Sequence, residues 1–327
     1  MRVLLISYMD NGQQHRLIAK AMRDFLGWDA KSIVNKESYL GFKTDWTVKD
    51  DLEEATEFAK TADMMIFQDM LLDIPNMGMV ELAGHRNTII NGTGTLMRNS
   101  ISINVLLNMQ MDGWAVVPPI SDETIASKLF PAPFENVIVP IEEINAITKG
   151  IKRNEVVTVC HAPTKSVLKG TDLVESILRP LDEEGVIKYL PIKGMAWNEA
   201  LRAKATAHIT IDSLGKEFEG EQKFPAAYGA GNALEGLVLG HIVIGRVSPW
   251  CYALHPDLPI VSTWGREEET AKIIKENITD GAEPLIRSSE LGRYEFKKYQ
   301  LEWVKTHFSA ENQVQKWKHY IDWVMHR

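Results

Sequence analysis

Short apolar runs alternate with longer stretches of helical periodicity through most of the chain, and this alternation limits the possible folds more than any other feature. The run at 2–7 predicts a buried strand. After it, Leu17, Ile18 and Met22 recur at the spacing of one helix face. Strands that alternate with helices are typical of α/β proteins with parallel sheets, so we expect an α/β fold.

The same alternation continues to the end of the chain. Further strands are expected at 30–34, 63–68, 87–91, 115–118, 137–140, 156–160, 187–191, 207–211 and 242–245. Further helices are expected at 50–60, 171–178 and 197–205 and from about 232, and the tail 291–327 is helical in pattern. Ser309 has the type and the place of an N-cap, so it should divide this tail into two helices.

A polar segment at 144–154, which contains Gly150, precedes a fresh apolar run. A length of 327 residues suits two domains, so we place a domain boundary after residue 150. Ligands of doubly wound sheets bind at the carboxyl ends of the strands. We therefore expect the principal site in a cleft between the two domains.

The chain has 45% hydrophobic and 24% charged residues, which is the composition of an ordinary soluble globular protein. Its formal net charge of −8 disfavours a broad nucleic-acid-binding surface. No run approaches the roughly 18 apolar residues that a membrane span requires, so no transmembrane segment is expected. Cys160 and Cys251 form no disulfide framework or metal-ligand set, which fits a reducing, cytoplasmic location without a bound metal.

A glycine-rich segment precedes the helix expected from about 232. Gly229, Ala230 and Gly231 allow a tight turn, and the helix that begins near Asn232 would point free N–H groups at an anion such as a phosphate. Glu235, on the first turn, could accept hydrogen bonds from ribose hydroxyls. The alternative interpretation is a loop that only packs the helix on the sheet, with Glu235 as a surface acid.

A second polar segment follows the strand expected at 156–160 and includes His161, Thr164, Lys165 and Lys169. Lys169 directly precedes a helix, where the helix dipole disfavours a cation. A bound anion explains a lysine at this place better than local stability does. Lys165 also fits a solvated loop lysine, and among the histidines His161 is a candidate because it lies beside the Lys169 loop.

These two segments, in this order and at this separation, resemble the donor half of group 1 glycosyltransferases, which are retaining enzymes with the GT-B fold. The likeness is best at 161–171 and at 233–240, and the second of these stretches resembles the family's Leu-Glu-Ala-Met-Ala-x-Gly segment. The tail at 303–309 resembles the family's closing helices. In the first half, 93–98 faintly resembles a His-Gly-Ser-Asp-Leu-Arg stretch.

The resemblance implies two Rossmann-like doubly wound domains that face a central cleft, at 1–150 and 151–295, with helices at 296–327 that cross back to the first domain. It implies a nucleotide-sugar donor, most simply a UDP-sugar, and a reaction without a cofactor or metal. The implied catalytic lysines are Lys169 and Lys165. The implied donor-binding residues are His161, Thr164, Gly229, Ala230, Gly231, Asn232 and Glu235, and the implied acceptor-side residues are Gly12, Thr93, Gly94 and Arg98.

Three positions depart from the family pattern. Ala227 stands where relatives often carry a second glutamate, Thr164 where they carry an arginine, and Thr93 where they carry a histidine. Two alternatives to a glycosyltransferase therefore stay open: a catalytically degenerate binding or scaffold protein, and an epimerase-like enzyme of nucleotide sugars. The acceptor also stays open between a glycan, a lipid-linked sugar, a small molecule and a modified nucleobase.

Overall fold

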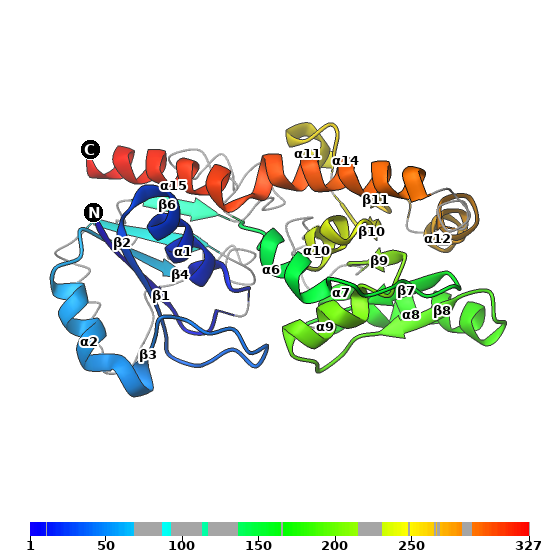
Figure 1. The fold of residues 1–327 in the computed structure, drawn as a ribbon, viewed down its shortest axis with the longest axis horizontal. Coiled ribbons are helices and arrows are strands. Elements are labelled where there is room, and N and C mark those ends of the chain that lie inside the picture. Colours follow the sequence, from blue (N-terminus) through cyan, green and yellow to red (C-terminus); the bar gives the residue numbers. More distant parts are fainter. Residues whose placement is uncertain are drawn as a thin grey trace. The chain divides into compact units, whose positions relative to one another are not determined.

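The computed structural model describes residues 1–10, 12–68, 87–92, 113–116, 137–164, 166–214, 231–247, 249–264, 266, 269–282 and 290–326. The chain divides into two compact units. The first unit consists of Met1–Ile138 and Phe308–Arg327, and the second unit is Val139–His307. Each unit contains one parallel β-sheet covered by helices, so the expected α/β fold is confirmed (Figure 1).

The first unit has a six-stranded sheet in the order β3-β2-β1-β4-β5-β6. This is the order of a doubly wound nucleotide-binding sheet. Its strands are β1 (Arg2–Ser7), β2 (Asp29–Val34), β3 (Trp46–Thr47), β4 (Met64–Gln68), β5 (Asn87–Gly92) and β6 (Gly113–Val116). Every neighbouring pair is parallel. The apolar runs of β1 and β4 are continuous because both faces of a parallel sheet are buried.

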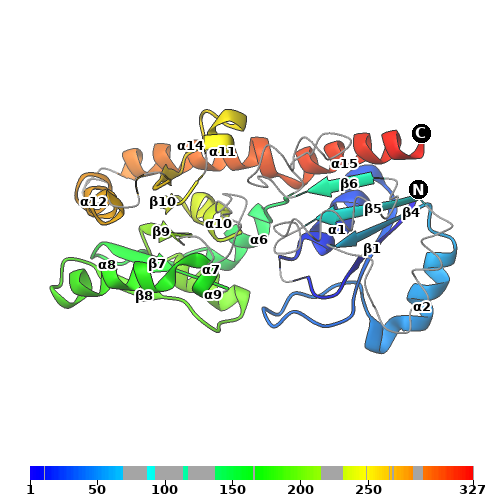
Figure 2. The ribbon, with the colours of Figure 1, turned by 180° about the vertical axis from the view of Figure 1, so that it is seen from behind.

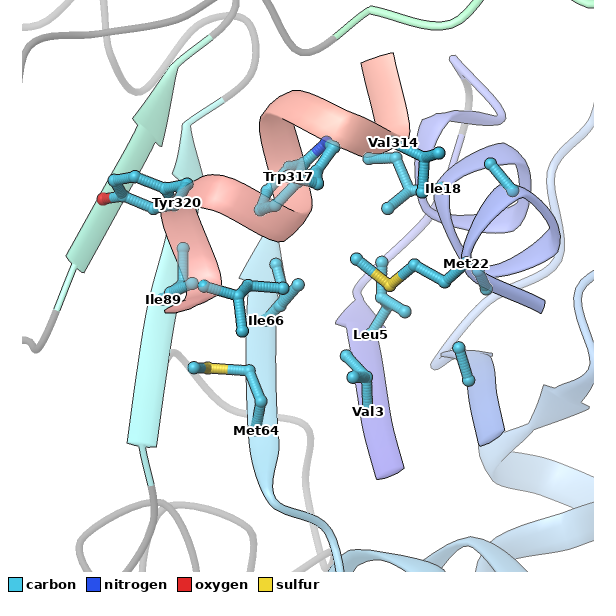
Figure 3. Close-up of a cluster of buried hydrophobic side chains, with 14 of the residues drawn as sticks. Val3, Leu5, Ile18, Met22, Met64, Ile66, Ile89, Val314, Trp317 and Tyr320 are labelled. Atoms are coloured by element: carbon cyan, nitrogen blue, oxygen red, sulfur yellow. The ribbon is translucent and has the colours of Figure 1, made fainter. Parts of the chain in front are cut away.

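Alternate residues of β1 and β4 point to opposite faces of this sheet, and a different helix layer covers each face. On one face, residues of α1 (Gln14–Leu26) and α15 (Ala310–Met325) pack on Val3, Leu5 and Ile66. Figure 3 shows Trp317 of α15 in this cluster. On the other face, α2 (Val48–Lys60) packs on Leu4, Ile6 and other strand residues.

The helical tail is divided where the sequence predicts. It forms α14 (Glu290–Phe308) and α15, and the Ser309 hydroxyl accepts a hydrogen bond from the Asn312 backbone N–H at 3.3 Å. Through His307 the tail belongs to the second unit, whereas Phe308–Arg327 belongs to the first. Figure 2 shows α15 beside α1 of the first unit. Among the residues that are described, no helix has the length and the apolar character that a membrane span requires.

The second unit has a five-stranded parallel sheet in the order β11-β10-β9-β7-β8. Its strands are β7 (Thr158–His161), β8 (Lys188–Pro191), β9 (Ile209–Ile211), β10 (Ile242–Gly245) and β11 (Val261–Ser262). Its other helices are α6 (Ile141–Thr148), α7 (Ser166–Lys169), α8 (Thr171–Glu183), α9 (Trp197–Lys204), α10 (Gly231–Leu239), α11 (Pro249–Leu254), α12 (Thr270–Glu276) and the π-helical segment η3 (Asn277–Ala282).

The second unit begins at Val139, earlier than the boundary expected after residue 150. Helix α6 explains the difference, because it contacts α9 and α10 and buries Ile141 and Ile144. The prediction of a strand at 137–140 is wrong. Ile138 is buried, but its N–H and C=O bond to the side-chain amide of Gln14, at 2.8 and 3.2 Å, and form no strand pairing.

Strand order decides which helices share a face of the second sheet. The chain moves one way along the sheet from β7 to β8 and the opposite way from β8 through β9 to β10. Parallel strand crossovers are right-handed, so α8 covers one face while α9 and α10 cover the other. The packing agrees: Val174 and Leu178 of α8 pack in one cluster, and Ala200 of α9 packs in another. Side chains of α9 and α10 can therefore meet.

Close packing of α10 on the sheet yields a first prediction. A Cβ at Gly236 would lie 3.0 Å from both Thr210 Oγ1 and Val243 Cγ2. Thr210 has little freedom to move, because its hydroxyl is 2.7 Å from His241 Nδ1 in the buried core. Overpacking costs about 1–3 kcal/mol, and the helix propensity of alanine offsets about 1 kcal/mol of it. We expect Gly236→Ala to lower the free energy of unfolding by up to about 2 kcal/mol.

Urea denaturation measures this loss, and Gly245→Ala is the matched control. A Cβ at Gly245 would make only an ordinary contact, 3.7 Å from Asp212 Cβ. A Gly236→Ala protein that is about 1 kcal/mol more stable than the wild type would show helix propensity acting without overpacking, so that α10 packs less closely on β9 and β10 than the structure indicates.

Candidate functional site

The carboxyl ends of two neighbouring strands, β7 and β9, place polar side chains at one edge of the second sheet. His161 ends β7, Asp212 directly follows β9, and the register pairs His161 with Ile211 and Ile211 with Ile244. Helix α10 follows β9 in the fold and begins at Gly231. Its first N–H groups have no partner within the helix, and such helix ends favour anions.

His161 is fully buried and both of its ring nitrogens are engaged inside the unit. Nδ1 is 2.9 Å from the Ile211 carbonyl oxygen and Nε2 is 3.0 Å from Thr171 Oγ1. A carbonyl only accepts, so Nδ1 carries the proton and Nε2 accepts from the threonine hydroxyl. Burial lowers the pKa of His161, which keeps the ring neutral. His161 therefore braces β7 against β9 and α8.

Lys169 ends α7 and reaches the residue that follows β9. Its Nζ is 2.9 Å from both carboxylate oxygens of Asp212, and Asn232 Nδ2 donates to Asp212 Oδ1 at 3.1 Å. The Asp212 side chain is 5% exposed and that of Lys169 18%. The carboxylate is thus held inside the sheet edge, while part of the lysine side chain stays accessible. Asn232 belongs to the first turn of α10, so the structure brings Lys169 and the α10 N-terminus together.

Glu235 lies one turn further along α10 and is held by two donors. Trp197 Nε1 donates to its Oε1 at 2.7 Å, and the Lys204 ammonium pairs with its Oε2. The Lys204 side chain is 3% exposed and that of Glu235 is 14% exposed. A Cβ at Gly231 would lie 3.9 Å from Glu235 Oε1, so this oxygen is close to the start of the helix. Glu235 is therefore an oriented, partly accessible carboxylate and not a freely solvated surface acid.

The remaining predicted residues fall into three groups: residues of the second unit, a residue of the first unit, and residues outside the described ranges. Thr164 is exposed in the segment after β7, and Gly231 is the exposed first residue of α10. Gly12 lies in the turn between β1 and α1 of the first unit. The others, Lys165, Gly229, Ala230, Thr93, Gly94 and Arg98, lie outside the described residues.

Asp212, Lys204 and Trp197 were not among the predicted site residues. Asp212 had a signal, since a carboxylate directly after an apolar strand lies at the carboxyl edge of a parallel sheet. Lys204 and Trp197 had none. Lys204 is 31 residues from Glu235 and Trp197 is 38 residues away, and only the packing of α9 beside α10 brings them together.

The turn that holds Gly12 contains buried titratable groups. Asp10 is buried, and its Oδ2 accepts the Arg16 backbone N–H at 3.0 Å. Gln13 has φ +50°, in the left-handed region that non-glycine residues rarely occupy. Burial raises the pKa of Asp10 to about 6, and burial lowers the pKa of His15 to about 3. The Asp10 carboxylate thus occupies the head of α1 as an internal anion.

Comparison with known proteins extends these observations. No protein family and no curated protein matches the sequence. Solved structures do match the fold. An alpha-glucosyltransferase in complex with UDP-glucose and DNA containing an abasic site is 10% identical, with a TM-score of 0.59 and 98% of each chain covered. AviGT4, a glycosyltransferase involved in avilamycin A biosynthesis, is 11% identical, with a TM-score of 0.59 over 99% of this chain and 98% of AviGT4.

A third similar structure is described with a different candidate activity. A Listeria monocytogenes protein described as a candidate UDP-N-acetylglucosamine 2-epimerase is 8% identical, with a TM-score of 0.52 over 98% of this chain and 95% of its own. Identities this low show the fold alone. The two parallel sheets and these neighbours confirm the expected GT-B-like fold.

The buried Asp10 yields a prediction of pH dependence. Its pKa is 3.8 in the unfolded chain and about 6 in the folded protein. The contribution of Asp10 to the free energy of unfolding is therefore fully present below pH 3.8 and is lost as the pH rises through about 6. Asn at this position can still accept the Arg16 N–H but does not ionise. We expect Asp10→Asn to gain stability relative to the wild type between pH 5 and pH 8, by about 1.4 kcal/mol.

Chemical denaturation of both proteins at the two pH values measures this change. Comparison with the wild type removes the opposite contribution of His15, which is the same in both proteins. A stability difference that does not vary with pH would contradict the raised pKa of Asp10.

Proposed function

We propose that the protein is a glycosyltransferase that moves a sugar from a UDP-sugar to an acceptor. One observation carries the proposal: the Lys169 ammonium, the N-terminus of α10 and the Glu235 carboxylate lie together at one sheet edge. A nucleoside diphosphate has an anionic end beside a ribose, and this edge offers a cation and a helix N-terminus beside a carboxylate. The fold neighbour with bound UDP-glucose supports the same donor class.

In the proposed mechanism the protein stabilises the leaving group. The bond from the anomeric carbon to the diphosphate breaks while positive charge builds on the sugar ring. Lys169 and the α10 N–H groups would stabilise the negative charge on the departing UDP. We propose that the acceptor hydroxyl oxygen bonds to the anomeric carbon on the face from which UDP leaves, while a leaving phosphate oxygen takes the hydroxyl proton. The anomeric configuration is then retained, and the proposed reaction needs no metal. No protein nucleophile is then required.

The acceptor would bind on the side of the first unit, near the turn that contains Gly12. A glycan, a lipid-linked sugar and a small molecule are candidates, together with a modified nucleobase. The formal charge of −8 favours the first three over DNA. Cys160 and Cys251 are buried and form no disulfide bond, which would fit action in the reducing cytoplasm.

Removal of the Lys169–Asp212 pair tests the phosphate site. A single lysine variant would leave Asp212 buried without its cation, so we use the double variant Lys169→Met/Asp212→Asn. The pair is neutral as a whole, and its removal tests directed N–H contacts more than net charge. We expect UDP affinity to fall about 10- to 100-fold, the value of one hydrogen bond to a charged group, while uridine affinity stays unchanged. Donor turnover should fall about 10²- to 10³-fold.

Isothermal titration calorimetry with UDP and uridine gives these affinities. Lys193→Met is the matched control, because Lys193 follows β8 but pairs with Glu175 at the surface. Wild-type UDP affinity in the double variant would contradict the assignment of Lys169. No saturable binding of any nucleoside diphosphate to the wild type would favour a degenerate binding or scaffold protein.

An epimerase-like enzyme is the second candidate, and the fold of the Listeria monocytogenes neighbour favours it. Such an enzyme would convert a UDP-sugar with no acceptor present. Incubation with UDP-glucose and UDP-N-acetylglucosamine, followed by chromatography of nucleotides and free sugars, separates the two. An altered sugar nucleotide or a released altered sugar would support the epimerase, whereas UDP formed only with an acceptor would support transfer.

A further inference from the structure

We infer that Trp197 and Lys204 are positioning residues that orient Glu235 to read both hydroxyls of a ribose, so that the site selects ribonucleoside over deoxyribonucleoside diphosphates. The inference rests on the proposed function and adds a specificity to it. It comes from the contacts of Glu235, since each of its carboxylate oxygens already has one donor from α9.

The two donors fix the carboxylate in a single orientation. Trp197 is the first residue of α9 and Lys204 the last, so they approach Glu235 from the two ends of one helix. The indole N–H holds Oε1 at 2.7 Å and the ammonium holds Oε2. With both oxygens anchored, the carboxylate cannot rotate without losing one of these bonds. This differs from an exposed glutamate, whose end rotates freely.

Burial shows that Lys204 serves Glu235. Lysine is almost never fully buried unless it is paired, and the Lys204 side chain is 3% exposed. The ammonium is turned inward, so it offers little surface to a ligand, while Glu235 keeps 14% of its side chain accessible. Lys204 therefore neutralises the carboxylate from behind and leaves its outer side as the recognition surface.

The remaining acceptor capacity matches a vicinal diol. An ionised carboxylate has about four lone-pair positions, two on each oxygen. One position on each oxygen is used by α9, which leaves one on each for a ligand. The 2′- and 3′-hydroxyls of ribose supply two neighbouring donors, whereas 2′-deoxyribose supplies one. A site built to bond a hydroxyl rejects the analogue that lacks it, because the oriented acceptor is then left without a partner.

Calorimetric affinities for UDP, dUDP and inorganic pyrophosphate test the inference. We expect the wild type to bind UDP about 10- to 100-fold more tightly than dUDP, the value of one hydrogen bond to a charged group. Trp197→Phe keeps an aromatic ring but removes the N–H that anchors Oε1. In this variant we expect the ratio of UDP affinity to dUDP affinity to fall by at least about threefold, while the affinity for pyrophosphate stays unchanged.

The control is Trp323→Phe, the same exchange on α15 of the first unit, and it should leave the ratio at the wild-type value. Lys204→Met is a second variant with the same expected direction, but it leaves Glu235 without its cation and can unfold the domain. If Lys204→Met unfolds, the comparison of Trp197→Phe with the wild type still tests the inference.

Three outcomes would overturn the inference. A wild-type ratio near one would show that Glu235 does not read both hydroxyls. If Trp197→Phe still binds UDP and its ratio of UDP affinity to dUDP affinity equals that of the wild type, Trp197 only packs α9. Both of these results leave the proposed function intact. A wild type that binds neither UDP nor any other nucleoside diphosphate would contradict the proposed function and the inference together.

Discussion

Both sheets depend on one constraint: a parallel strand has two faces to bury and needs a crossover before the next strand can run in the same direction. The crossovers cover the faces with helices and align every carboxyl end of a sheet at one edge. Residues that follow different strands therefore become neighbours without being close in sequence. Lys169 and Asp212 are 43 residues apart and meet because they follow β7 and β9, which are adjacent strands.

Periodicity in the sequence predicts the elements that bury a regular pattern. It indicated β1, α1 and the division of the tail at Ser309, because each of these depends on residues within one or two turns of itself. It failed at 137–140, an apolar segment whose backbone bonds to the side chain of Gln14, 124 residues away. Burial alone makes such a segment apolar, and burial does not require a strand.

Two of the four charged side chains at the candidate site were predicted from the sequence. Lys169 and Glu235 carry sequence signals, a cation before a helix and an acid on the first turn after a glycine-rich segment. Of their buried partners, Asp212 carries a weaker signal, its place directly after an apolar strand, and Lys204 carries none. Lys204 resembles a solvated lysine at a helix end, and only the strand order, which puts α9 and α10 on one face, turns it inward toward Glu235. A charge that is satisfied by tertiary packing cannot be distinguished in sequence from one that is satisfied by water.

The two ion pairs at this sheet edge differ in which partner is buried, so the two ends of the edge expose opposite charges. In one pair the anion Asp212 is buried and the cation Lys169 is the more accessible partner, whereas in the other the cation Lys204 is buried and the anion Glu235 is accessible. Each accessible charge is balanced from behind, so neither pair adds net charge to the edge. Under the proposed function, recognition of the donor would then depend on the order of cation, helix N-terminus and carboxylate and less on attraction between net charges. A ligand whose anionic end lies beside neighbouring hydroxyls fits that order in one direction only.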